Sequence, residues 1–127
     1  ILKIPQDIRI VLLVPSRKTR TGELDRKRFS PLQRISELAY VEASNGRVWD
    51  ALTLNGLAIS SVLGEDPQPA LAAIEAGALG AGLSGKGPAV ATIVEDDNLR
   101  PVRRALEKFE GKIVQAKPNF SKAVIEN

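Results

Sequence analysis

The sequence contains no cysteine, no histidine and no methionine, and only five of its residues are aromatic. Without cysteine there can be no disulfide and no thiolate nucleophile. Without histidine there can be no imidazole metal ligand and no catalytic triad with a histidine base. Because the chain begins at Ile1 and lacks methionine, we expect it to be a piece cut from a longer protein.

Long apolar runs are also missing. No segment approaches the roughly 18–20 apolar residues that span a bilayer. Residues 1–14 lack the basic start, apolar block and cleavage site of a signal peptide, so we expect a cytoplasmic protein. With 127 residues, 43% of them hydrophobic and 26% charged, the chain suits one globular domain with its own core.

Positive charge gathers near the start of the chain, although the formal net charge is only +3. Glu23 and Asp25 are the only acidic residues between positions 17 and 34. The basic residues of this region are Arg17, Lys18, Arg20, Arg26, Lys27, Arg28 and Arg34. A solvated surface and a pocket for an anionic small molecule both fit this cluster. Nucleic acid fits less well, because Phe29 is the one aromatic neighbour and no binding motif is present.

The hydrophobic patterns predict an α+β sandwich, with helices packed on one face of a small sheet. The expected order is strand, three helices, strand, helix, strand. We expect strands at 8–14, 89–94 and 112–116, and helices that start at Ser30-Pro31, Arg47, Asp66-Pro67 and Asn98. Gly64 and Gly111 are placed to end helices.

The sequence also makes a prediction for the end of the third helix and one for the adjacent acidic residues Asp96 and Asp97. The third helix is expected to continue into the glycine-rich stretch, where its small side chains would let another backbone approach closely. Asp96 and Asp97 are expected to serve helix capping rather than metal binding.

The stretch Gly77–Ala89 reads GALGAGLSGKGPA and resembles a phosphate-binding loop. Residues 80–87 nearly fit the Walker A pattern, but Gly87 stands where a hydroxyl is required. The same residues contain the spacing of a dinucleotide fingerprint. Both motifs need a strand before the loop and a helix after it, whereas here we expect a helix before and a strand after. We therefore reject both, which leaves a tight connector or a backbone that passes close to a ligand.

The pattern [GA]-x-G-A-x-L-S-G-x-G-P at positions 78–88 resembles the third motif of the GHMP kinases. Three further stretches are similar to the archaeal-type shikimate kinases of that family. They are LLVPSRKTRT at 12–21, the long segment 50–89, and KIVQAKPNFSKAV at 112–124. The resemblance thus covers most of the chain.

This resemblance implies that residues 1–127 form the C-terminal domain of a GHMP kinase, a ferredoxin-like sandwich with an antiparallel sheet. The N-terminal domain, which holds most of the ATP and magnesium contacts, is not found in this sequence. The implied reaction is phosphoryl transfer from ATP to a hydroxyl of shikimate, a step of the chorismate pathway in aromatic amino acid biosynthesis. No catalytic residue and no metal site is implied here, so we expect this chain alone to be inactive.

The resemblance also implies two sets of site residues. The third motif would support the phosphate loop of the N-terminal domain through Gly80, Gly82, Ser84, Gly85, Lys86, Gly87 and Pro88. The carboxylate of shikimate would be bound by residues after the first strand, namely Arg17, Lys18, Arg20 and Thr21. Arg20 is the first choice, since its planar fork suits a carboxylate.

Lys86 and Asn55 leave open questions. Lys86 stands where the family usually has serine or threonine, and it either stabilises the transferred phosphoryl group or points into solvent. Asn55 faces either a cleft or the core.

Two other functions remain compatible with the sequence. One is another GHMP kinase, such as homoserine kinase. The other is a non-catalytic anion-binding module of the same fold. No nucleic acid or membrane partner is expected.

Overall fold

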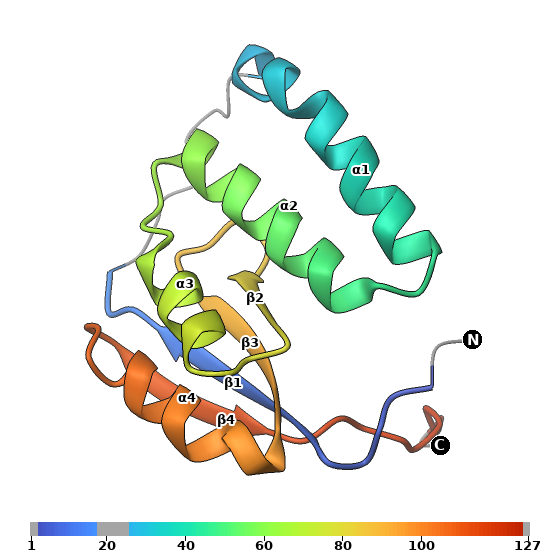
Figure 1. Ribbon diagram of the computed structural model, residues 1–127, viewed down its shortest axis with the longest axis vertical. Coiled ribbons are helices and arrows are strands. Elements are labelled where there is room, and N and C mark those ends of the chain that lie inside the picture. The colour runs from blue at the N-terminus through green and yellow to red at the C-terminus, as the bar shows by residue number, and fades with distance from the viewer. Residues whose placement is uncertain (1–2, 18–25, 126–127) are drawn as a thin grey trace.

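The computed structural model describes residues 3–17 and 26–125 (Figure 1). Its elements, in chain order, are β1 (Ile8–Val14), the 3-10 helix η1 (Arg26–Leu32), α1 (Gln33–Ser44), α2 (Val48–Leu63), α3 (Gln68–Glu75), β2 (Gly80–Leu83), β3 (Val90–Glu95), the 3-10 helix η2 (Asp96–Asn98), α4 (Leu99–Leu106) and β4 (Lys112–Ala116). None of the helices in the described ranges is long and apolar enough to cross a membrane.

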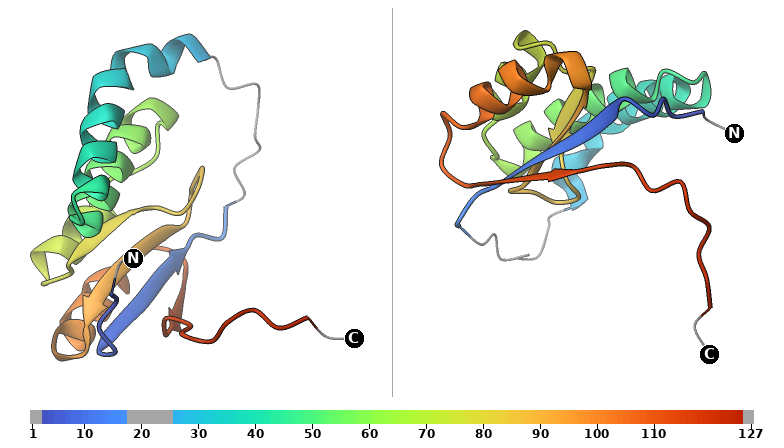
Figure 2. Two further views of the ribbon diagram at one scale, coloured as in Figure 1. Left: turned by 90° about the vertical axis from the view of Figure 1, so that its right-hand side faces the viewer. Right: turned by 90° about the horizontal axis from the view of Figure 1, so that it is seen from below.

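The four strands form one antiparallel sheet in the order β2-β3-β1-β4. Helices α3 and α4 pack on one face of it, and the hydrophobic core lies between them and the sheet (Figure 2). The core contains Val11, Leu13, Ala70, Ala73, Ala81, Val90, Val94, Val102 and Leu106. The α+β fold with helices on a small antiparallel sheet is thus confirmed.

The two longer helices, α1 and α2, lie beside the sheet. Helix α2 runs along the edge strand β2, and α1 packs on the far side of α2 (Figures 1 and 2). The Thr53 hydroxyl of α2 accepts a hydrogen bond of 3.1 Å from the Ala81 amide, so the helix satisfies part of the open strand edge.

Glycines at this contact allow the two backbones to approach closely. A Cβ atom added at Gly56 of α2 would lie 2.5 Å from the Cα of Gly82. A Cβ added at Gly82 would lie 2.8 Å from the Leu52 carbonyl oxygen, and one added at Gly80 would lie 2.7 Å from the Trp49 carbonyl oxygen. We conclude that Gly80 and Gly82 pack β2 against α2.

This arrangement corrects the prediction for the middle of the chain. The third helix ends at Glu75 and does not continue into the glycine stretch, because Gly77 takes the positive φ of +105°. Residues 80–83 form strand β2 rather than part of a loop. The close approach that we expected of the third helix is therefore made by β2.

Helix ends agree with the sequence only in part. Gly64 ends α2 in the left-handed conformation, as predicted. At the start of α3, Asp66 accepts a hydrogen bond of 2.9 Å from the Gln68 amide. Ser30 was expected to cap α1, but the 3-10 helix η1 precedes α1 and its N-cap position is Leu32. Asn98 does stand at the N-cap of α4, after the 3-10 helix η2, but its side chain makes no capping hydrogen bond. Asp96 and Asp97 stand in the first turn of η2, whose N-cap position is Glu95, and Asp96 pairs with Arg9 at 2.7 Å.

Candidate functional site

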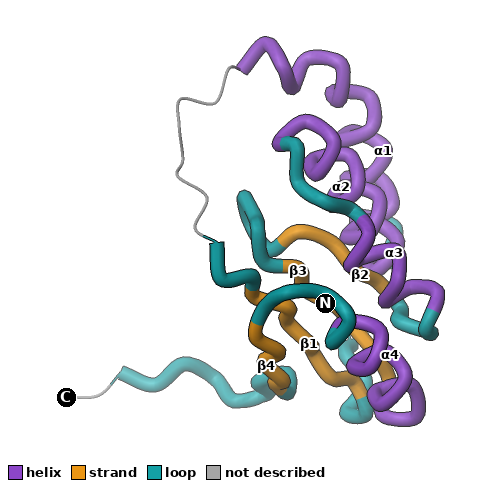
Figure 3. Tube along the Cα trace, turned by 90° about the vertical axis from the view of Figure 1, so that its left-hand side faces the viewer, coloured by secondary structure: helices purple, strands orange, loops and turns teal. Residues whose placement is uncertain are grey.

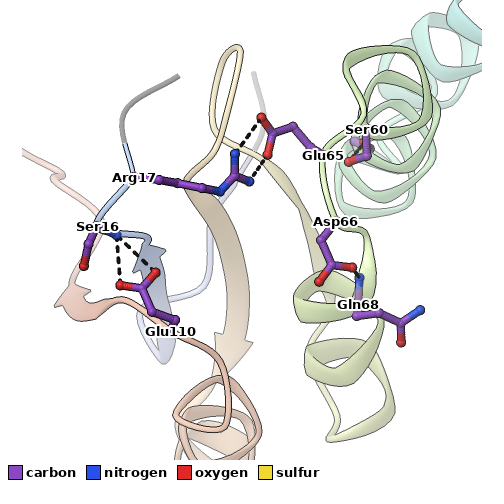
Figure 4. A network of polar contacts seen from close by, with 8 residues as sticks. Ser16, Arg17, Ser60, Glu65, Asp66, Gln68 and Glu110 are labelled. Atoms are coloured by element: carbon purple, nitrogen blue, oxygen red, sulfur yellow. Dashed lines mark hydrogen bonds and ion pairs between the residues drawn. The ribbon is translucent and has the colours of Figure 1, made fainter. Parts of the chain in front are cut away.

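Three connecting segments meet on one side of the molecule (Figures 3 and 4). They are the end of β1 at Pro15–Arg17, the turn between α2 and α3 at Gly64–Asp66, and the hairpin between β2 and β3 at Ser84–Ala89. A hollow of ≈ 450 Å³ is lined here by Val14, Pro15, Ser16, Arg17, Gly87, Pro88 and Ala89. The structure therefore brings the start of the basic segment and the end of the glycine-rich motif to one place.

The hairpin tip is a tight turn that two glycines make possible. Gly85 and Gly87 have φ angles of +64° and +75°, which other residues rarely adopt. The Ser84 amide donates to the Ala89 carbonyl at 2.8 Å and closes the hairpin, while Lys86 is exposed at its tip. Strand β3 follows directly. Because no helix N-terminus follows the tip, it lacks the aligned amides of a Walker A or dinucleotide loop.

Arg17 is bound by a carboxylate that the sequence analysis did not single out. Both terminal nitrogens of its guanidinium contact the carboxylate of Glu65, one of them at 3.4 Å from Oε1 and the other in close contact with Oε2. The Arg17 side chain is 53% exposed, whereas that of Glu65 is only 6% exposed. The hydrogen bond with Glu65 raises the pKa of Arg17, so the guanidinium stays charged.

The backbone explains why Glu65 points inward. Gly64 turns the chain at the end of α2 with a φ of +68°, and the Glu65 amide then donates to the Ser60 carbonyl at 3.0 Å. A Cβ added at Gly87 would lie 3.4 Å from the Glu65 Cγ, so the side chain runs directly beside the hairpin tip. Glu65 thus lies between Arg17 and the glycine-rich motif.

Two further carboxylates lie near Arg17. Glu110 accepts hydrogen bonds of 3.3 Å at both oxygens from the Ser16 amide (Figure 4). Contacts with the Ser16 side chain and amide lower the pKa of Glu110. Arg17, Asp66 and Glu110 also line a second, smaller hollow of ≈ 170 Å³. The guanidinium of Arg17 therefore lies in acidic surroundings that already balance its charge.

Other residues named from the sequence lie elsewhere. Lys18, Arg20 and Thr21 fall outside the described residues, so their placement stays a prediction. Asn55 is exposed and lines a groove of ≈ 370 Å³ between α1 and α2, so it is not a core residue. Within the described part of the chain, no three or more carboxylate, cysteine or histidine side chains come together to hold a metal ion.

Residues 23–112 match the family model described as GHMP kinases C terminal. The chain belongs to this family. It is 41% identical over 115 residues to a shikimate kinase of Methanothermobacter thermautotrophicus, which covers 90% of this chain and 40% of that protein. A shikimate kinase of Methanothrix thermoacetophila is 36% identical over 84% of this chain and 37% of its own length. The chain therefore spans about two fifths of these relatives.

The fold has a counterpart among solved structures. The crystal structure of homoserine kinase from Cytophaga hutchinsonii superposes with a TM-score of 0.66 over 91% of this chain and 43% of that chain. The identity is 17%, so this likeness concerns the fold alone.

Proposed function

We propose that this chain is the C-terminal domain of a shikimate kinase, which transfers the terminal phosphoryl group of ATP to a hydroxyl of shikimate. The similarity to archaeal shikimate kinases over nine tenths of the chain carries this proposal. The hollow beside the glycine-rich hairpin supports it, because Arg17 of the expected substrate residues and Gly87 and Pro88 of the third motif line it together. We further propose a cytoplasmic protein that acts in aromatic amino acid biosynthesis.

The chain would contribute contacts to shikimate rather than most of the contacts to the phosphates of ATP. Arg17, Lys18, Arg20 and Thr21 would bind shikimate. Arg17 can do so beside Glu65, because a guanidinium has five N–H donors and the two contacts with Glu65 leave others available. Of the four, Arg20 remains our choice for the carboxylate, since the charge of Arg17 is already balanced.

The hairpin would serve as one wall of the site where phosphoryl transfer occurs. Gly85, Gly87 and Pro88 give it a narrow tip, and Gly80 and Gly82 fix its first strand on α2. We propose that this tip supports the phosphate loop of an N-terminal domain. That domain would bind ATP and supply most of the magnesium contacts.

The intact gene product is expected to form ADP from ATP in the presence of shikimate, whereas this chain alone is expected to form none. A coupled ADP assay with shikimate and with homoserine as separate substrates tests this. Turnover of homoserine in place of shikimate would move the protein to another branch of the family. Turnover of neither substrate, with anion binding retained, would favour a non-catalytic module. Turnover by the isolated chain would contradict the proposal that catalysis needs the N-terminal domain.

A further inference from the structure

Glu65 is an unusual residue for its surroundings. Carboxylates are seldom buried unless they are paired. Glu65 is buried, and its partner Arg17 is half exposed at the rim of the hollow. The exposed partner is screened by water, and the cost of removing the buried partner from water can exceed what the ion pair gains. A stabilising role therefore does not explain why this carboxylate is buried here.

The geometry of the Arg17–Glu65 pair explains the burial of Glu65 better than a stabilising role does. A single contact leaves a long arginine side chain free to rotate, but contacts through both terminal nitrogens fix the plane of the guanidinium. Glu65 makes both contacts, and it is itself held by the turn after Gly64 and by the hairpin at Gly87. The remaining N–H donors of Arg17 are thus held in one orientation at the edge of the hollow.

We propose that Glu65 is a positioning residue that acts through Arg17. It holds the guanidinium beside the hairpin tip and so sets where an oxygen atom of the substrate is bound. This inference rests on the proposed function, because it takes Arg17 as a substrate contact. Since Glu65 also offsets the charge of Arg17, the pair orients the substrate by hydrogen bonds more than it attracts an anion from a distance.

Kinetics of the intact gene product test the proposal through Glu65→Gln, which keeps the shape of the side chain and removes its charge. The KM for shikimate is expected to rise by roughly tenfold, the effect of losing one hydrogen bond to a charged group. The KM for ATP is expected to stay within about twofold, since the amide has the same shape and keeps the packing of residue 65 against the hairpin tip. Glu107→Gln is the matched control, because Glu107 forms an exposed ion pair with Arg103 on α4 at 2.8 Å. It is expected to change neither KM.

A double-mutant cycle separates positioning from a structural role. Arg17→Gln alone is expected to raise the KM for shikimate, and adding Glu65→Gln to it is expected to raise it no further. Glu65→Asp, which keeps the charge on a shorter side chain, is expected to recover part of the loss. Independent effects in the double variant, or equal increases in both KM values with a lower melting temperature, would overturn the proposal.

A measurement without substrate keeps this inference separate from the proposed function. The side-chain Nε–H signal of Arg17 in ¹⁵N NMR is expected to be sharp in the wild type and in Glu107→Gln, and to broaden in Glu65→Gln. If the wild type shows this signal but does not turn over shikimate, the proposed function fails while the pairing holds. If the signal does not respond to Glu65→Gln, the positioning role itself is refuted.

Discussion

Replacing Gly56 by alanine is expected to lower the free energy of unfolding by roughly 2 kcal/mol or more, toward the upper part of the usual range for overpacking. The new Cβ would lie 2.5 Å from the Gly82 Cα and 3.1 Å from the Leu83 nitrogen. Both are backbone atoms, so no side chain can rotate to make room. Alanine gains about 1 kcal/mol over glycine in a helix, which is too little to offset this clash.

Urea unfolding of Gly56→Ala, followed by circular dichroism, measures this effect. Ser61→Ala is the control, because Ser61 is exposed on the same helix and its hydroxyl donates to the Ala58 carbonyl of its own turn. It is expected to change the unfolding free energy by less than about 0.5 kcal/mol. A Gly56→Ala protein as stable as the wild type would show that α2 and β2 are not packed backbone to backbone.

Replacing Leu106 by alanine is expected to cost roughly 2–5 kcal/mol, the usual loss when a buried leucine leaves a cavity. Leu106 is 0% exposed and packs in the core between α4 and the sheet. Leu38→Ala on α1 removes the same atoms from a side chain that is 53% exposed, so it is expected to cost little. Thermal unfolding of both variants distinguishes the two sites. Equal losses would contradict the assignment of the core.

Elements with a strong pattern of their own were predicted well. Ile8–Val14 forms a strand with the predicted bounds, because a run of β-branched residues suits a buried strand. Helix α2 begins one residue after the predicted start and ends at Leu63, with Gly64 as its C-cap. Strand β2 was missed because glycine and alanine have weak strand propensity. Its existence depends on hydrogen bonds to β3 and on packing with α2, which are contacts between distant parts of the chain.

The residues of the candidate site, like the secondary structure, were predictable only in part. The sequence indicated Arg17, Gly87 and Pro88, and these three residues line one hollow in the structure. It did not indicate Glu65, because no local pattern relates residues 48 positions apart. An acidic residue directly after a glycine that ends a helix was the only available signal, and it is a weak one.

The contact between α2 and β2 has a consequence for the spacing within the site. Helix α2 is fixed to β2 at Gly56, and it delivers Glu65 directly after its end at Gly64. Each helical residue adds about 1.5 Å and 100°. A single insertion between Gly56 and Gly64 would therefore turn Glu65 away from Arg17, although the sheet itself would be unchanged. The turn at 45–47 lies beyond this anchor, so the chain length there is free to vary without altering the distance between Glu65 and the hairpin.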